Sequence, residues 1–248
     1  MDKKLNLSFI FPMYNELENI TPCVQGAMRI GAKLGIDYEI IIIDDASNDG
    51  SGELADKLAV SYPVIKVIHH PVNRKLGGAL KTGFAAAVKD YVLYMDSDLP
   101  LDFDEVCAAI PRIASADMLI GYRLFRAESL WRKFISTVYN RMIRQFFGLK
   151  VRDVNFSFKL FKREICQQLD LQSEGSFIDA ELLIEAYHRG YSIREIGLHY
   201  YPRIAGESTL ASAAVIKKIL QEMWLYYHQH RNNNAGFPKP ITSINHNA

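Results

Sequence analysis

Tyr94-Met95-Asp96-Ser97-Asp98-Leu99-Pro100 is the stretch from which both the fold and the chemistry of this chain can be read. The residues before it, 91–95, are apolar and β-favouring, which predicts a buried strand. Asp96 and Asp98 are two residues apart at the end of this strand, and a turn that begins at Asp96 can bring their carboxylates together. Pro100 favours such a turn.

Two converging carboxylates repel each other unless a cation lies between them, and oxygen ligands favour Mg²⁺ or Mn²⁺. Ligands of open α/β sheets bind at the carboxyl edge of the strands. The pattern therefore predicts a metal–phosphate site at Asp96 and Asp98. The alternative is a solvated acidic turn in which an aspartate caps the next helix.

Composition restricts the class of protein. The chain has 248 residues, 49% of them hydrophobic, which is ample for a core, and a net charge of +1 that gives no sign of nucleic-acid binding. Cys23, Cys107 and Cys166 are odd in number and far apart, which indicates a reducing compartment. No window has the roughly 18 uncharged apolar residues of a membrane span. We expect a cytoplasmic protein, and peripheral contact with the cytoplasmic face of a membrane stays open.

Strand and helix patterns alternate through the first half of the chain, as in a doubly wound α/β fold with a mostly parallel sheet. A helix is predicted from Thr21-Pro22 to near Gly35, and residues 73–78 are predicted as a loop. The strands are predicted at 5–11, 38–43, 64–69, 91–95 and 118–121, and the other helices at 51–62, 79–89 and 102–113.

The second half predicts helices at 129–147, 178–189 and 210–229 and strands at 155–162 and 192–201. We expect one domain over 1–229, with a nucleotide-binding half (1–122), an acceptor-binding half (123–229) and a disordered tail (230–248). The last helix is amphipathic, and it could lie on a membrane, pack on a partner or close the core. Its predicted apolar face holds Leu210, Ala213, Ile216, Leu220, Met223, Trp224 and Tyr227.

Two more polar turns follow predicted strands, at Pro12-Met13-Tyr14-Asn15-Glu16 and at Asp44-Asp45. In a parallel sheet they share an edge with Asp96. Asp45 is then a contact for base or ribose, unless these acids only cap helices and turns. Lys75-Leu76-Gly77-Gly78 lacks the spacing of a dinucleotide-binding or P-loop motif.

The chain resembles glycosyltransferase family 2 of the GT-A fold, in its polyprenyl-phosphate (dolichol-phosphate) sugar transferase branch, from about Leu7 to Ser208. The opening Pro12-Met13-Tyr14 does not fit the glycine-rich loop of a nucleotidyltransferase. The matching motifs are 11–20, 43–51, 73–83, Asp96-Ser97-Asp98, Gly121-Tyr122-Arg123, Arg152-Asp153, 177–182 and 201–208.

The resemblance implies a role for each matching position. Donor binding falls to Pro12, Tyr14, Glu16, Asp44, Asp45, Lys81, Asp96 and Ser97, and metal binding to Asp96 and Asp98. Acceptor binding falls to Arg123, Arg132, Lys133, Arg203 and Ser208, and the catalytic set is Asp98, Arg123, Asp179 and Glu181. Three departures loosen the acceptor assignment: Pro100 stands where relatives place a further metal ligand, 152–158 lacks Ser/Thr-Gly-Phe, and Thr209 replaces a lysine.

These features predict an inverting transferase that moves a hexose from a GDP- or UDP-sugar to polyprenyl phosphate with Mg²⁺ or Mn²⁺. A phosphate acceptor is already an anion and needs positioning by Arg123 and Arg132. A saccharide-hydroxyl acceptor, the nearest alternative, needs a general base, for which Asp179 is the best choice. A non-catalytic nucleotide-sugar-binding subunit that docks to a membrane partner is the other alternative. The sequence leaves homo-oligomerisation open.

Overall fold

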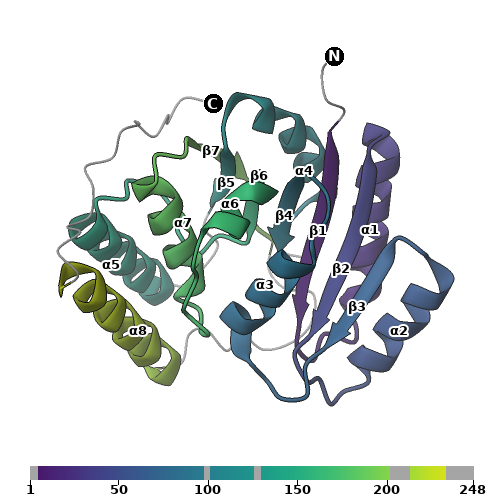
Figure 1. The fold of residues 1–248 in the computed structure, drawn as a ribbon, viewed down its shortest axis with the longest axis horizontal. Coiled ribbons are helices and arrows are strands. Elements are labelled where there is room, and N and C mark those ends of the chain that lie inside the picture. The colour runs from purple at the N-terminus through teal and green to yellow at the C-terminus, as the bar shows by residue number, and fades with distance from the viewer. Residues whose placement is uncertain (1–4, 98–100, 126–129, 202–212, 233–248) are drawn as a thin grey trace.

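The computed structural model describes residues 5–97, 101–125, 130–201 and 213–232 (Figure 1). A seven-stranded sheet in the order β3-β2-β1-β4-β6-β5-β7 runs through the molecule. The strands are β1 Asn6–Met13, β2 Asp37–Asp44, β3 Ile65–His69, β4 Tyr91–Met95, β5 Met118–Arg123, β6 Phe158–Lys162 and β7 Ile193–Leu198.

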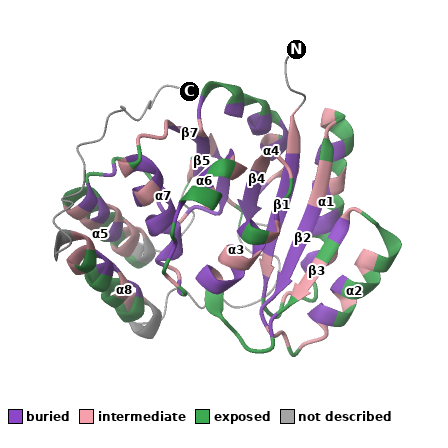
Figure 2. Cartoon of the chain, viewed as in Figure 1, coloured by how far each residue is buried: buried purple, intermediate pink, exposed green. Residues whose placement is uncertain are grey.

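Helices cover both faces of the sheet, as the doubly wound prediction requires (Figure 1). One buried cluster joins the sheet to α1 and α4, and the other joins it to α3, α5, α7 and α8 (Figure 2). The helices are α1 Ile20–Leu34, α2 Ser51–Ser61, α3 Lys75–Ala86, α4 Phe103–Ala109, α5 Leu130–Phe147, α6 Arg163–Gln168, α7 Ile178–His188 and α8 Ala213–Asn232, with a 3₁₀ turn over Ile110–Ser115.

The strand directions place the predicted turns on one edge of the sheet. β1 pairs in parallel with β2 and β4, and the pairing of Met13 with Asp44 brings the first two strand ends level. β6 runs antiparallel between β4 and β5, so that Met95 pairs with Phe158 and Ile120 with Lys159. The carboxyl ends of β4 and β5 therefore face the same edge, and β6 begins between them.

The predicted loop over 73–78 is wrong, because α3 begins at Lys75. The Gly77 amide donates to the Glu174 carbonyl at 2.8 Å, and a Cβ at Gly77 would overlap the backbone of Ser173. The glycines therefore permit a close backbone contact inside a helix rather than a flexible loop. The start of α1 also shifts, to Ile20, because the Glu16 carbonyl accepts the amides of Asn19 and Ile20.

The predicted apolar face of the last helix is also partly wrong. Ile219, Met223 and Tyr226 are buried, whereas Leu220 and Trp224 are 36% and 57% exposed. The Tyr226 ring packs on the rings of Phe147 and Phe177, which fixes the rotation of α8.

α8 continues through Asn232, past the predicted end at 229 and into the first residues of the predicted tail, whose remainder (233–248) lies outside the described residues, as does Leu210. No helix in the described part of the chain is long and apolar enough to cross a membrane.

Candidate active site

The turns after β1 and β2 are joined to each other by hydrogen bonds. The Asn15 amide donates to Ser47 Oγ at 3.0 Å, and Asn15 Oδ1 accepts the Asn48 amide at 2.9 Å. Asn15 has a φ of 56°, a left-handed conformation that asparagine tolerates better than most residues. Two predicted donor-binding turns thus form one surface, on which Tyr14 is 48% exposed.

The carboxylate of Asp44 holds its own turn together. Its Oδ1 accepts the Ser47 amide at 3.0 Å, and its Oδ2 lies 2.8 Å from Nδ1 of His69. The hydrogen bond to Asp44, followed by one to Asp56, raises the pKa of His69. Both Asp44 oxygens therefore have protein partners, which matches the capping alternative better than donor binding.

Asp45 is placed differently. Its Oδ1 accepts the Arg74 amide at 2.8 Å and lies 2.7 Å from Nδ1 of buried His70, whose Nε2 is 2.9 Å from Thr82 Oγ1. These contacts use one of its two carboxylate oxygens. His70 was not among the predicted site residues; its signal was a histidine directly after a predicted strand.

The turn after β4 is tied to β1. Ser97 Oγ donates to the Pro12 carbonyl at 2.9 Å, and the Ser97 carbonyl accepts the Cys23 thiol at 3.2 Å. Ser97 is buried, and its side chain holds the turn against β1. Asp96 Oδ1 accepts the Tyr94 hydroxyl at 3.0 Å. Asp98 and Pro100 lie outside the described residues.

A buried ion pair lies next to this turn. Lys159 Nζ is 2.6 Å from Asp179 Oδ1, donates to the Phe156 carbonyl at 2.9 Å and lies 5.3 Å from the ring centroid of Tyr94. Burial raises the pKa of Asp179 to about 6, against the opposing charge and hydrogen bond of Lys159. Lys159 was not among the predicted site residues; its signal was a lysine within an apolar strand.

Arg123 is held at the end of β5. Its Nη1 lies 2.9 Å from Asp153 Oδ2, and its guanidinium carbon lies 4.5 Å from the ring centroid of Tyr200 and 5.7 Å from that of Phe156. An arginine clamped in this way is pre-organised to meet an anion. Lys133 is half-buried on α5. The side chain of Arg132 lies outside the described part, as do Arg203 and Ser208.

Glu181, predicted to face the sugar, has a structural role in the described residues. Glu181 is fully buried, and its two carboxylate oxygens accept the amides of Gln172 at 2.6 Å and Ser173 at 2.8 Å. Lys81 holds the same segment, since its Nζ lies 2.5 Å from Glu174 Oε1 and 3.2 Å from the Gln172 carbonyl. Both side chains fix the 170–175 segment against α3 and α7.

Electrostatic coupling links the ends of β4 and β5. The negative charges of Asp96 and Asp153 both raise the pKa of Asp179 further, so the three carboxylates repel one another. Such repulsion between hard oxygen donors suits a divalent cation. The described residues by themselves contain no group of three metal-ligating side chains, so a metal at Asp96 requires a ligand beyond them, such as Asp98.

A mixed sheet with two joined turns at β1 and β2 and an aspartate at the end of β4 is the arrangement of a GT-A fold. Residues 8–170 match the family model described as Glycosyl transferase family 2. The chain belongs to this family and is a glycosyltransferase.

Several curated proteins are similar in sequence. An undecaprenyl-phosphate mannosyltransferase of Micrococcus luteus is 27% identical over 83% of this chain and 88% of its own. A polyprenol monophosphomannose synthase of Mycolicibacterium smegmatis is 28% identical over 83% and 81%. An undecaprenyl-phosphate 4-deoxy-4-formamido-L-arabinose transferase of Pectobacterium atrosepticum is 33% identical, and the chain spans about half of that protein (66% and 51%).

Solved structures share the fold. Glucosyl-3-phosphoglycerate synthase from Mycobacterium tuberculosis, bound to phosphoglyceric acid, superposes with a TM-score of 0.71 at 18% identity, over 91% of this chain and 80% of that one. The same enzyme was solved with Mn²⁺ and UDP. Mannosyl-3-phosphoglycerate synthase from Rubrobacter xylanophilus gives 0.70 at 12% identity, over 96% and 79%.

Proposed function

We propose that this glycosyltransferase transfers a hexose from a nucleotide sugar to polyprenyl phosphate, with inversion at the anomeric carbon. Two relatives that cover most of both chains are named for polyprenyl-phosphate mannose transfer, which supports this acceptor class. The observation that carries the proposal is Arg123 at the end of β5, clamped by Asp153, a carboxylate that acts together with Asp96 on the buried Asp179.

Each strand end has a part in this proposal. The joined turns at Tyr14, Glu16 and Asp45 hold the nucleoside of the donor. Asp96 and Asp98 hold Mg²⁺ or Mn²⁺, which neutralises charge on the leaving diphosphate when bound. Arg123 receives the acceptor phosphate, and Arg132, Lys133, Arg203 and Ser208 complete the acceptor side.

The contacts of Asp179 favour a phosphate over a saccharide hydroxyl. A hydroxyl acceptor needs a general base within hydrogen-bond reach of its proton. Asp179 is buried and its Oδ1 is occupied by Lys159. A phosphate acceptor brings its own anionic oxygen, so positioning by Arg123 suffices.

Peripheral membrane contact fits the same acceptor. Trp131 and Phe134 of α5 stack at 6.0 Å and are 65% and 60% exposed, and Trp224 of α8 is 57% exposed. Aromatic side chains of this kind favour the interface between water and lipid. We propose that α5 and α8 rest on the membrane from which the acceptor is drawn.

The test is a transfer assay with radiolabelled GDP-mannose and UDP-glucose, each with undecaprenyl phosphate in mixed micelles. We expect labelled lipid from one donor, its loss on chelation by EDTA and its recovery with Mn²⁺ or Mg²⁺. Asp98→Asn should abolish transfer, while Asp104→Asn, which removes an exposed acid on α4, should not. Full turnover by Asp98→Asn would refute the metal role. Transfer to a saccharide but never to the lipid phosphate would establish the hydroxyl alternative.

A further inference from the structure

A cleft of about 660 Å³ lies along α5, beside the segment that follows this helix. Arg141 and Arg144 of α5 line one side, and Val151 and Arg152 line the other. We call it the arginine cleft. None of its described lining residues is acidic, although the whole chain carries a net charge of only +1. The predicted function makes no use of Arg141, Arg144 or Arg152.

The chain builds this cleft by a turn at the end of α5. Gly148, with a φ of 72°, ends the helix and turns the chain back, and Leu149 and Val151 are buried. Asn140 Oδ1 accepts the Val154 amide at 3.1 Å, which ties the returning segment to the helix. The arginines of the two walls are therefore held opposite each other by the fold.

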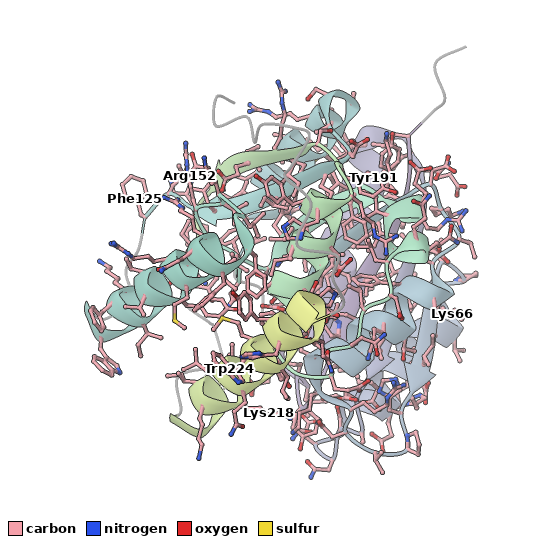
Figure 3. The ribbon with its side chains drawn as sticks, turned by 60° about the vertical axis from the view of Figure 1, so that its left-hand side comes forward. Lys66, Phe125, Arg152, Tyr191, Lys218 and Trp224 are labelled. Atoms are coloured by element: carbon pink, nitrogen blue, oxygen red, sulfur yellow. The ribbon has the colours of Figure 1, made fainter. Side chains whose placement is uncertain are left out.

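Arg152 is held in place by Glu195 and Tyr122. Its amide donates to Glu195 Oε1 at 2.6 Å, its Nε lies 3.7 Å from Glu195 Oε2, and its guanidinium carbon lies 4.4 Å from the ring centroid of Tyr122. Figure 3 shows Arg152 beside α5, far from Lys66 on the other side of the molecule. A guanidinium stacked and paired in this way loses little freedom when it binds an anion.

Arg141 and Arg144 lie three residues apart on one helix face, where like charges repel. Both are exposed, and no described residue forms an ion pair with either of them. Arg144 in the last turn complements the negative end of the helix dipole. That effect falls off within one turn, so it does not account for Arg141. An anion in the cleft would relieve the repulsion between Arg141 and Arg144, and Arg152, which is paired with Glu195, would face the same anion.

We propose that the arginine cleft is a phosphate-binding site distinct from the donor diphosphate site. Guanidinium groups bind phosphate oxygens in a fork of two hydrogen bonds, and the cleft is large enough for a headgroup. The phosphate comes either from a lipid headgroup or from a free phosphate compound. The lipid source rests on the proposed function, because α5 also carries the exposed Trp131 and Phe134.

The cleft and the acceptor site are neighbours along the chain. Tyr122 and Arg152 stack on the cleft side, and the residues that follow them, Arg123 and Asp153, form the ion pair on the proposed acceptor side. Binding of a lipid headgroup at the cleft would therefore set the height of Arg123 above the membrane. Free phosphate can also occupy Arg123, so the contribution of the cleft is the part of phosphate binding that is lost when Arg141 and Arg144 are replaced.

The experiment compares the full chain with Arg141→Gln/Arg144→Gln and with a control that loses the same charge elsewhere. Lys57→Gln/Lys66→Gln serves as the control, since both lysines are exposed on α2 and β3. One arm titrates inorganic phosphate and pyrophosphate in EDTA, so that the metal-dependent donor site is silent. The other arm measures sedimentation with phosphatidylcholine vesicles, with and without phosphatidylglycerol.

We expect the cleft variant to bind at least about tenfold more weakly than wild type in one arm or both, and the control to bind like wild type. Loss with anionic vesicles alone assigns a lipid headgroup, and loss with inorganic phosphate assigns a free phosphate compound. Equal binding by the cleft variant and wild type in both arms, or no binding by wild type, overturns the proposal. Manganese-dependent nucleotide binding by the cleft variant checks its fold. Absence of sugar transfer by wild type would refute the proposed function. The proposal of a phosphate site in the cleft would then still be judged by the two binding measurements.

Discussion

Lys159 Nζ of β6 lies 2.6 Å from Asp179 Oδ1 at the start of α7, and both side chains are buried. The lysine also faces the ring of Tyr94, whose hydroxyl donates to Asp96. The pair thus supports the carboxylate that the proposed function assigns to the metal. A buried pair of this kind is costly to break, because removal of one partner leaves the other charge unpaired.

Lys159→Met should therefore lower the free energy of unfolding by about 3–5 kcal/mol. Lys159→Arg, which keeps the charge, should lose less. The double variant Lys159→Met/Asp179→Leu should recover part of the loss, because no charge is then stranded. Urea unfolding of the three variants measures this. Equal stability of Lys159→Met and wild type would mean that the pair contributes nothing.

Asp179 should make stability depend on pH. Its folded pKa of about 6 lies above the ordinary value of 3.8, so the folded state binds the proton more tightly than the unfolded chain does. This contribution to stability is present at low pH and is lost as the pH rises from about 4 through about 6. Asp179→Asn should remove that pH dependence, a change of order 1–3 kcal/mol. Thermal unfolding from pH 4 to pH 7 tests it; parallel curves for variant and wild type would contradict the shift.

Arg123→Lys should impair the acceptor step more than donor binding. A lysine keeps the charge but loses the planar fork and the stacking on Tyr200. We expect kcat/KM for the lipid phosphate to fall by about 10- to 100-fold, equivalent to one charge-assisted hydrogen bond. Calorimetric binding of the donor nucleotide should stay unchanged. A loss of nucleotide binding equal to the loss of transfer would place Arg123 on the donor side instead.

Glu181→Gln should lower the free energy of unfolding without changing the rate of sugar transfer per folded molecule. An amide has only one acceptor oxygen for the amides of Gln172 and Ser173, which now share two. We expect a loss of about 1–3 kcal/mol in the free energy of unfolding, with kcat per folded molecule unchanged. Glu164→Gln, an exposed glutamate on α6, is the matched control. A large fall in kcat with full stability would restore Glu181 to the sugar site.

Gly121→Ala should disturb Arg123 through its neighbour. A Cβ at Gly121 would overlap the ring of Phe156, which is buried and lies 5.7 Å from the Arg123 guanidinium. Overpacking of this kind costs about 1–3 kcal/mol. The variant should lose stability and acceptor affinity together, and a second change to a smaller side chain, Phe156→Leu, should restore part of both. If Phe156→Leu gave no recovery, the overlap would not be the cause.

The local features of this fold were predictable because they depend on neighbouring residues. Period-two and period-3.6 patterns predicted most strands and helices, and polar residues at strand ends predicted one shared edge for the turns at Tyr14, Asp45 and Asp96. The missed elements had tertiary causes. Gly77 reads as a loop residue, and only its contact with the backbone of Ser173 and Glu174 explains a helix there.

The sequence by itself determined the α/β class, the family and the turns that follow β1, β2 and β4, because these are encoded in short contiguous motifs. The tertiary structure decided which charged side chains meet. The insertion of antiparallel β6 between β4 and β5 carries Lys159 to Tyr94 and Asp179, and no local pattern predicts that strand order. The tertiary structure also buried Glu181 and decided which face of α8 is buried. Both depend on contacts between elements that are far apart in the sequence.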